Sequence, residues 1–74
     1  MDKKTWETIA KRIRDVEERT AVLANELLNV RDSGLKKDGN DYKVLMDVID
    51  FVQSAGSRLS AAAIDAEDRA SYLR

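Results

Sequence analysis

The sequence lacks cysteine, histidine and proline, and it contains only three glycines among its 74 residues. Without cysteine the chain can form no disulfide and no thiolate, and without histidine it offers no imidazole as a metal ligand or general base. These absences exclude cysteine and Ser-His-Asp nucleophilic catalysis and the common zinc sites. The lack of proline, together with 36% charged residues, favours long helices over a fold with many turns.

Strong charge of one sign and long apolar runs are also missing. The formal net charge is −1, so the chain as a whole is not drawn to nucleic acid or anionic lipid. No apolar run approaches the roughly 18 residues that span a bilayer, and the first residues lack the apolar core of a signal peptide. We therefore expect a soluble, cytoplasmic protein that does not act at a membrane.

The most regular pattern is in the second half of the chain, where apolar or small residues alternate at intervals of three and four. These residues are Tyr42, Leu45, Ile49, Val52, Gly56, Leu59, Ala63, Ala66, Ala70 and Leu73. Such a heptad pattern is typical of a helix that keeps one edge against another helix. It predicts a helix over about 41–73.

A second heptad pattern occupies the first half of the chain. It consists of Trp6, Ile9, Ile13, Val16, Thr20, Leu23, Leu27 and Val30, and it predicts a helix over about 5–32. Asp2 and Thr5 are both candidate N-caps, because their side-chain oxygens can accept from the free N–H groups of a first helical turn.

Residues 33–40 separate the two patterns and predict a turn. Gly34 suits the left-handed conformation that ends many helices, and Asp38-Gly39 is a turn signal. We expect Asn40 or Asp41 to cap the second helix. A short connection favours antiparallel neighbours, so the predicted fold is all-α: one domain, residues 1–74, forming an antiparallel helical hairpin of two long helices. The alternative is a three-helix bundle bent near Gly56, since weak helix formers occupy 53–57.

The second predicted helix carries a second apolar stripe beside the heptad pattern. Its members are Val44, Val48, Phe51 and Ala55. One hairpin partner cannot cover both stripes, and a hairpin of this size buries little apolar surface by itself. We therefore predict that this stripe is a protein interface, either in a homodimeric four-helix bundle or higher helical oligomer, or with another protein. The alternative is a monomer in which Leu35 and a bent C-terminus cover the stripe.

Two further groups of residues are candidate contacts. Lys4, Lys11, Arg12 and Arg14 gather near the start of the first helix, where two copies in an oligomer would offer them to RNA or nucleotide phosphates. A solvated charged face is the competing interpretation. Tyr72 and Arg74 near the C-terminus are residue types favoured in binding sites, and a frayed terminus is the alternative there.

No residues in the pattern of a catalytic, cofactor or metal site are present. The carboxylates of Asp65, Glu67 and Asp68 lack the histidines of the Glu-x-x-His di-metal pattern. We therefore predict a non-enzymatic interaction protein, without cofactor or metal, that self-associates and binds a larger protein as an inhibitor, adaptor or accessory factor. Phages and mobile elements are an expected origin for so small a protein. The alternative function is binding of RNA or a small phosphorylated nucleotide through the basic residues.

Overall fold

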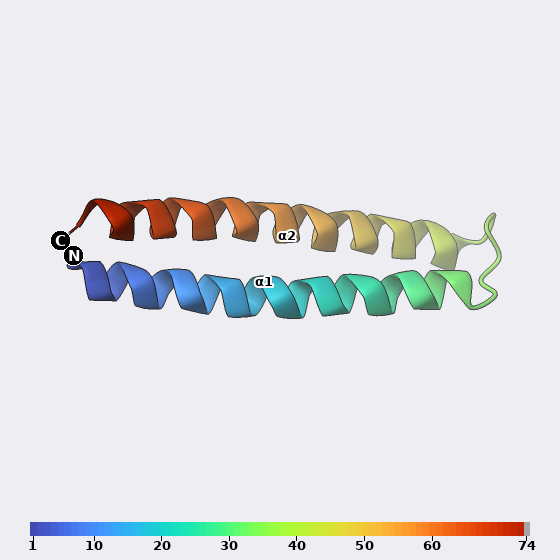
Figure 1. Ribbon diagram of the computed structural model, residues 1–74. Coiled ribbons are helices and arrows are strands. Elements are labelled where there is room, and N and C mark those ends of the chain that lie inside the picture. Colours follow the sequence, from blue (N-terminus) through green and yellow to red (C-terminus); the bar gives the residue numbers. More distant parts are fainter. Residues whose placement is uncertain (74) are drawn as a thin grey trace.

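The structure is a computed structural model, which describes residues 1–73 and consists of two long helices lying side by side and antiparallel (Figure 1). Helix α1 spans Lys3–Asp32 and helix α2 spans Asn40–Tyr72. The first and last described residues lie at the same end of the hairpin and the turn lies at the other. The molecule measures 55 × 14 × 12 Å. The predicted all-α antiparallel hairpin is therefore confirmed.

Helix α1 begins with a side-chain cap. The carboxylate of Asp2 accepts a hydrogen bond from the backbone N–H of Thr5 at 2.8 Å, and the Asp2 backbone is extended, as an N-cap requires. The same hydrogen bond lowers the pKa of Asp2. Of the two candidate caps, Asp2 is the one used, so the helix starts two residues earlier than predicted.

The turn between the helices uses its two glycines differently. Gly34 has φ of +108°, a conformation that side chains disfavour, so it ends α1 as predicted. Gly39 is the N-cap of α2, and the prediction that Asn40 or Asp41 caps this helix is wrong. The Gly39 N–H donates to the Lys36 carbonyl at 3.0 Å, and the Gly39 carbonyl already accepts from the Lys43 N–H at 3.3 Å. The helix therefore starts at Asn40 without a side-chain cap.

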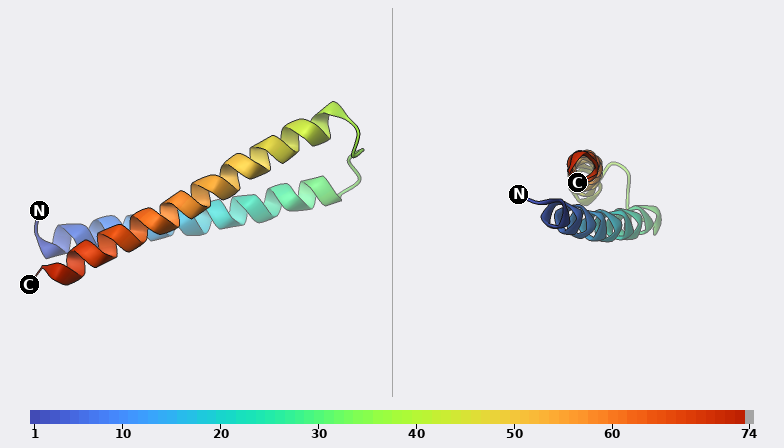
Figure 2. Two further views of the ribbon diagram at one scale, coloured as in Figure 1. Left: turned by 90° about the horizontal axis from the view of Figure 1, so that it is seen from above. Right: turned by 60° about the vertical axis from the view of Figure 1, so that its left-hand side comes forward.

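Helix α2 runs through Gly56 without a break, so the bent three-helix alternative is wrong. A glycine inside a helix costs about 1 kcal/mol relative to alanine, which packing along the rest of the helix outweighs. The two helices cross at a shallow angle and spread apart toward the turn, as the view from above shows (Figure 2).

The core between the helices is narrow and made mostly of small side chains. The fully buried residues of the described chain are Ala10 on α1 and Ile49, Ala63, Ala66 and Ala70 on α2. All four on α2 belong to its predicted heptad pattern. Ile49 is the one large side chain among them, so the hairpin core by itself contains little apolar volume.

Helix α1 is rotated relative to the sequence-based prediction. Val16, Leu23 and Val30, which were expected to pack against α2, are each about half exposed, at 49%, 44% and 50%. Ala10 is buried in their place, and Glu17, Ala24 and Arg31 are half-buried along the same line. Alanines at positions 10 and 24 let the two backbones approach closely on this side.

Candidate interaction surface

An arginine on α1 joins the two helices along one edge of the hairpin. The Arg14 guanidinium donates two hydrogen bonds to the Glu67 carboxylate on α2, at 2.7 and 3.1 Å, and a third to Glu17 at 2.8 Å. This paired geometry lowers the pKa of both carboxyl groups and raises that of Arg14. The Ser60 hydroxyl of α2 also lowers the pKa of Glu17. We call this side, with Arg14, Glu17, Ser60 and Glu67, the ion-pair edge.

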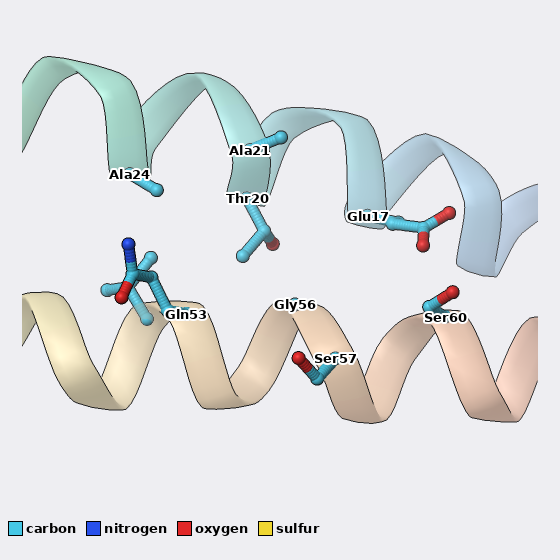
Figure 3. Close-up of a pocket in the computed structure, with 9 residues that line it drawn as sticks. Glu17, Thr20, Ala21, Ala24, Gln53, Gly56, Ser57 and Ser60 are labelled. Atoms are coloured by element: carbon cyan, nitrogen blue, oxygen red, sulfur yellow. The ribbon is translucent and has the colours of Figure 1, made fainter.

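A shallow groove of about 350 Å³ follows the ion-pair edge toward the middle of the hairpin (Figure 3). Its walls are mostly small residues: Glu17, Thr20, Ala21, Ala24, Val52, Gln53, Gly56, Ser57 and Ser60. Figure 3 shows Thr20 pointing from α1 toward Gly56, and Glu17 facing Ser60 across the gap. The groove is open to solvent and holds no cluster of titratable groups suited to catalysis.

Helix α1 exposes a line of aliphatic side chains at regular spacing. Val16, Leu23 and Val30 follow one another at intervals of seven residues, so they lie along one line of the helix. Each is about half exposed. These three regularly spaced aliphatic side chains are exposed to a similar degree, and they form one half of an unpartnered surface.

Helix α2 exposes the other half of that surface. Phe51 is 76% exposed, Val44 is 61% exposed, and Val48 and Ala55 are also open to solvent. These are the four residues predicted as a protein interface. Neither Leu35 nor the C-terminal part of α2 covers them, so the alternative of a covered stripe in a monomer is wrong.

The two exposed halves lie on the same side of the hairpin. On α1, Val16 and Glu17 are about 100° apart around the helix axis, and they lie on opposite sides of the line of α1 that faces α2. On α2, Val48 and Ala55 lie on one side of the Ile49–Gly56 line, and Ser60 and Glu67 lie on the other. Because Arg14 and Glu67 meet on one edge, the aliphatic lines of both helices share the opposite edge. We call this surface the apolar face; its residues are Val16, Leu23, Val30, Val44, Val48, Phe51 and Ala55.

Charged side chains border the apolar face. Arg19 and Glu26 flank the aliphatic line of α1 and are exposed. On α2, Asp41 and Arg69 stand at the two ends of the line that contains Val48 and Ala55, and Arg58 lies beyond Phe51. Within residues 1–73 the ion pairs of the hairpin do not include these five.

The predicted phosphate contacts all lie in the first half of α1, and one of them is already paired with carboxylates. Lys4, Lys11 and Arg12 are exposed, and Lys4 and Arg12 line one shallow depression beside Thr5 and Thr8. Arg14 is bound to Glu17 and Glu67 on the ion-pair edge. Phosphate binding therefore stays a prediction that rests on the three other residues. Of the predicted terminal contacts, Tyr72 is exposed, and Arg74 lies outside the described residues.

The α1 half of the apolar face was not predicted, because the heptad pattern of the first helix places Val16, Leu23 and Val30 against the second helix. A signal for the correct rotation was present. Ala10, Ala24 and Leu28 follow beside the seam, and small residues there allow close packing of α1 on α2. This signal alone does not decide the rotation, because Ile13, Thr20 and Leu27 belong to both neighbouring faces of α1.

Residues 1–73 contain no cluster of three or more acidic side chains close enough to hold a metal ion. Neither α1 nor α2 is long and apolar enough to cross a membrane. Comparison with protein-family models, curated proteins and solved structures finds no match to this chain. Any functional conclusion therefore rests on the surfaces described above.

Proposed function

We propose that this chain is a non-enzymatic interaction protein that self-associates through its apolar face and, once assembled, binds a larger protein as an inhibitor, adaptor or accessory factor. The observation that carries the proposal is the apolar face itself. It joins two aliphatic lines from different helices on one side of a hairpin, and contiguous exposed apolar surface of this kind marks protein interfaces.

The exposed area of the chain supports self-association. The 8.3-kDa chain exposes 5805 Å². A folded monomer of this mass exposes about 4,600 Å², so the hairpin carries an excess of about 1,200 Å². Two copies that each buried this excess would form an interface of about 2,400 Å² in total, which is within the range of obligate homodimers.

The opposite side of the hairpin supports the second part of the proposal. The groove lined by Ala21, Ala24, Gly56 and Ser57 lies on the ion-pair edge, away from the apolar face. Self-association through the apolar face leaves this groove on the outside of the assembly. A larger protein partner therefore still has an irregular surface to contact after the hairpins have paired.

Native mass spectrometry of two matched variants tests self-association. Phe51→Asp places a charge in the apolar face, and we expect it to convert the oligomer to monomer while the helix content measured by circular dichroism is retained. Ile64→Asp is the control, because Ile64 is 48% exposed and lies toward the ion-pair edge. We expect this variant to keep the wild-type assembly. A wild-type protein that is monomeric at micromolar concentration would refute the proposal.

A further inference from the structure

The charges around the apolar face specify how two copies pair. We propose that the hairpins form an antiparallel homodimer, related by a two-fold axis perpendicular to the long axis of the hairpin, which passes near Leu23 and Ala55. This arrangement sets α1 against the partner's α1 and α2 against the partner's α2. The inference rests on the self-association proposed above and adds the orientation and register of the partner.

The aliphatic line of α1 is symmetric about Leu23. Val16 precedes Leu23 by seven residues and Val30 follows it by seven. A two-fold axis through Leu23 therefore places Leu23 against the partner's Leu23 and Val16 against the partner's Val30. Paired heptad positions of two antiparallel helices bury aliphatic side chains in this way.

The charges beside this line are complementary under the same symmetry. Arg19 lies four residues before Leu23, and Glu26 lies three residues after it. The axis brings Arg19 to within about one residue, or about 1.5 Å along the helix, of the partner's Glu26. The two-fold symmetry forms this pair twice, so the dimer gains two ion pairs from residues that form no ion pair within residues 1–73 of the hairpin.

Helix α2 repeats the pattern with opposite charges at its two ends. Its line on the apolar face reads Asp41, Val48, Ala55, Ala62 and Arg69 at intervals of seven. An axis at Ala55 sets Asp41 against the partner's Arg69. It also brings Phe51 to within about one residue of the partner's Arg58, where a guanidinium can lie on the aromatic ring.

A single two-fold axis fits both helices because the two residues that it passes, Leu23 on α1 and Ala55 on α2, lie at nearly the same height along the hairpin. A Cβ added to Gly56 would lie 3.7 Å from the Thr20 methyl group, which fixes the register of α1 on α2. Leu23 is three residues from Thr20 toward the turn, and Ala55 is one residue from Gly56 in the same direction. The positions of Leu23 and Ala55 therefore differ by about 3 Å along the hairpin.

The competing orientation has its two-fold axis along the hairpin, with both turns at the same end. The register then places Arg19 at the level of the partner's Arg58, so like charges meet at the border of the interface, and it brings Arg12 to within about one residue of the partner's Asp65, so that an attractive pair offsets the repulsive one. The antiparallel orientation has the Arg19 and Asp41 ion pairs and sets no like charges among these border residues against each other. Electrostatic complementarity therefore selects the antiparallel dimer.

The absence of native cysteine makes disulfide cross-linking a direct test of the axis. We expect Leu23→Cys to form a covalent dimer with its own copy under mild oxidation, and Ala61→Cys, an exposed control outside the apolar face, not to do so. We also expect mixed Val16→Cys and Val30→Cys proteins to cross-link to each other. In the competing orientation, Leu23→Cys would instead cross-link only with Ala55→Cys.

A charge exchange tests the register without cysteine. Arg19→Glu sets like charges against each other, and we expect it to raise the dimer dissociation constant roughly tenfold. The double variant Arg19→Glu, Glu26→Arg should return it to near the wild-type value. A double variant as weak as the single one would overturn the proposed pairing.

The two proposals fail in different ways. A wild-type monomer by native mass spectrometry would refute self-association, and the orientation with it. A stable dimer in which Leu23→Cys does not cross-link with itself and the charge exchange does not rescue would refute the antiparallel register alone.

Discussion

At the scale of single residues, two glycines have opposite roles in this hairpin. Gly34 ends α1 with φ of +108°, where any other residue is strained. Gly56 lies in the middle of a helix, and a Cβ added there would meet the Thr20 methyl group at 3.7 Å, an ordinary van der Waals contact. Close approach of α1 therefore does not require glycine at position 56.

We predict that Gly56→Ala stabilises the protein by about 0.5–1 kcal/mol, because alanine is the better helix former and the site has room for its methyl group. Gly34→Ala is the matched change in the turn, and we expect it to destabilise the protein by about 1 kcal/mol. Urea unfolding at a single protein concentration measures both values. A loss of stability in Gly56→Ala would show that the helices pack more tightly there than the structure indicates.

At the scale of the helices, the Arg14 contacts form in the rotation that α1 takes. The guanidinium binds Glu17 on its own helix and Glu67 on α2, so it favours the rotation in which Ala10 and Ala24 turn toward α2. The same rotation moves Val16, Leu23 and Val30 outward. One polar contact between residues distant in sequence thus accompanies the formation of the apolar face.

We predict that this contact gives the protein an acid-sensitive contribution to stability. The pKa values of Glu17 and Glu67 are lowered by Arg14. A lowered folded-state pKa contributes stability that is present above the unfolded-state pKa of about 4.3 and is lost as pH falls through the folded-state value. Urea unfolding from pH 7 down to pH 3 should therefore show a loss of stability that is smaller in Arg14→Gln.

The pH comparison includes an internal control. Asp2 also has a lowered pKa, through its hydrogen bond to Thr5. Protonation of Asp2 at acid pH therefore also lowers the stability of the protein. Arg14→Gln leaves Asp2 untouched, so the difference between the two curves isolates the ion-pair edge. Parallel curves for the two proteins would mean that the Arg14 contacts contribute nothing measurable in solution.

At the scale of the whole molecule, the hairpin has a thin core and a large surface. Within residues 1–73, four of the five buried residues are alanine, and the chain exposes 5805 Å². Burial of the apolar face in a dimer would therefore supply a large part of the apolar contacts that stabilise the fold. Folding and assembly would then be coupled by mass action, with the monomeric hairpin folded but less stable than the dimer.

Coupled folding and assembly predicts a melting temperature that depends on protein concentration. With an unfolding enthalpy of about 0.7 kcal/mol per residue, a tenfold increase in concentration should raise the Tm of a dimer by about 5 °C. Circular dichroism melts at several concentrations measure this shift. Phe51→Asp should melt at a lower temperature that does not change with concentration. A concentration-independent wild-type Tm would contradict the coupling.

Much of this architecture was predictable because heptad spacing is a local property of the chain. The two helices, the turn between them and the left-handed Gly34 all follow from residues close together in sequence. The stripe Val44, Val48, Phe51 and Ala55 was also predictable as an apolar surplus. The cap at Gly39 was not predicted, because it uses backbone hydrogen bonds to Lys36 and Lys43, which do not depend on the types of side chain present.

The spacing of apolar residues alone is enough to specify two helices and an antiparallel hairpin, because helical periodicity needs no knowledge of the partner. It does not specify which of two adjacent faces of α1 packs inward, since Ile13, Thr20 and Leu27 belong to both. The tertiary structure made that choice, through the small side chains of Ala10 and Ala24 and the pairing of Arg14 with Glu67. The α1 half of the apolar face faces solvent in the rotation in which these contacts form, and Arg14 and Glu67 are 53 residues apart in the sequence.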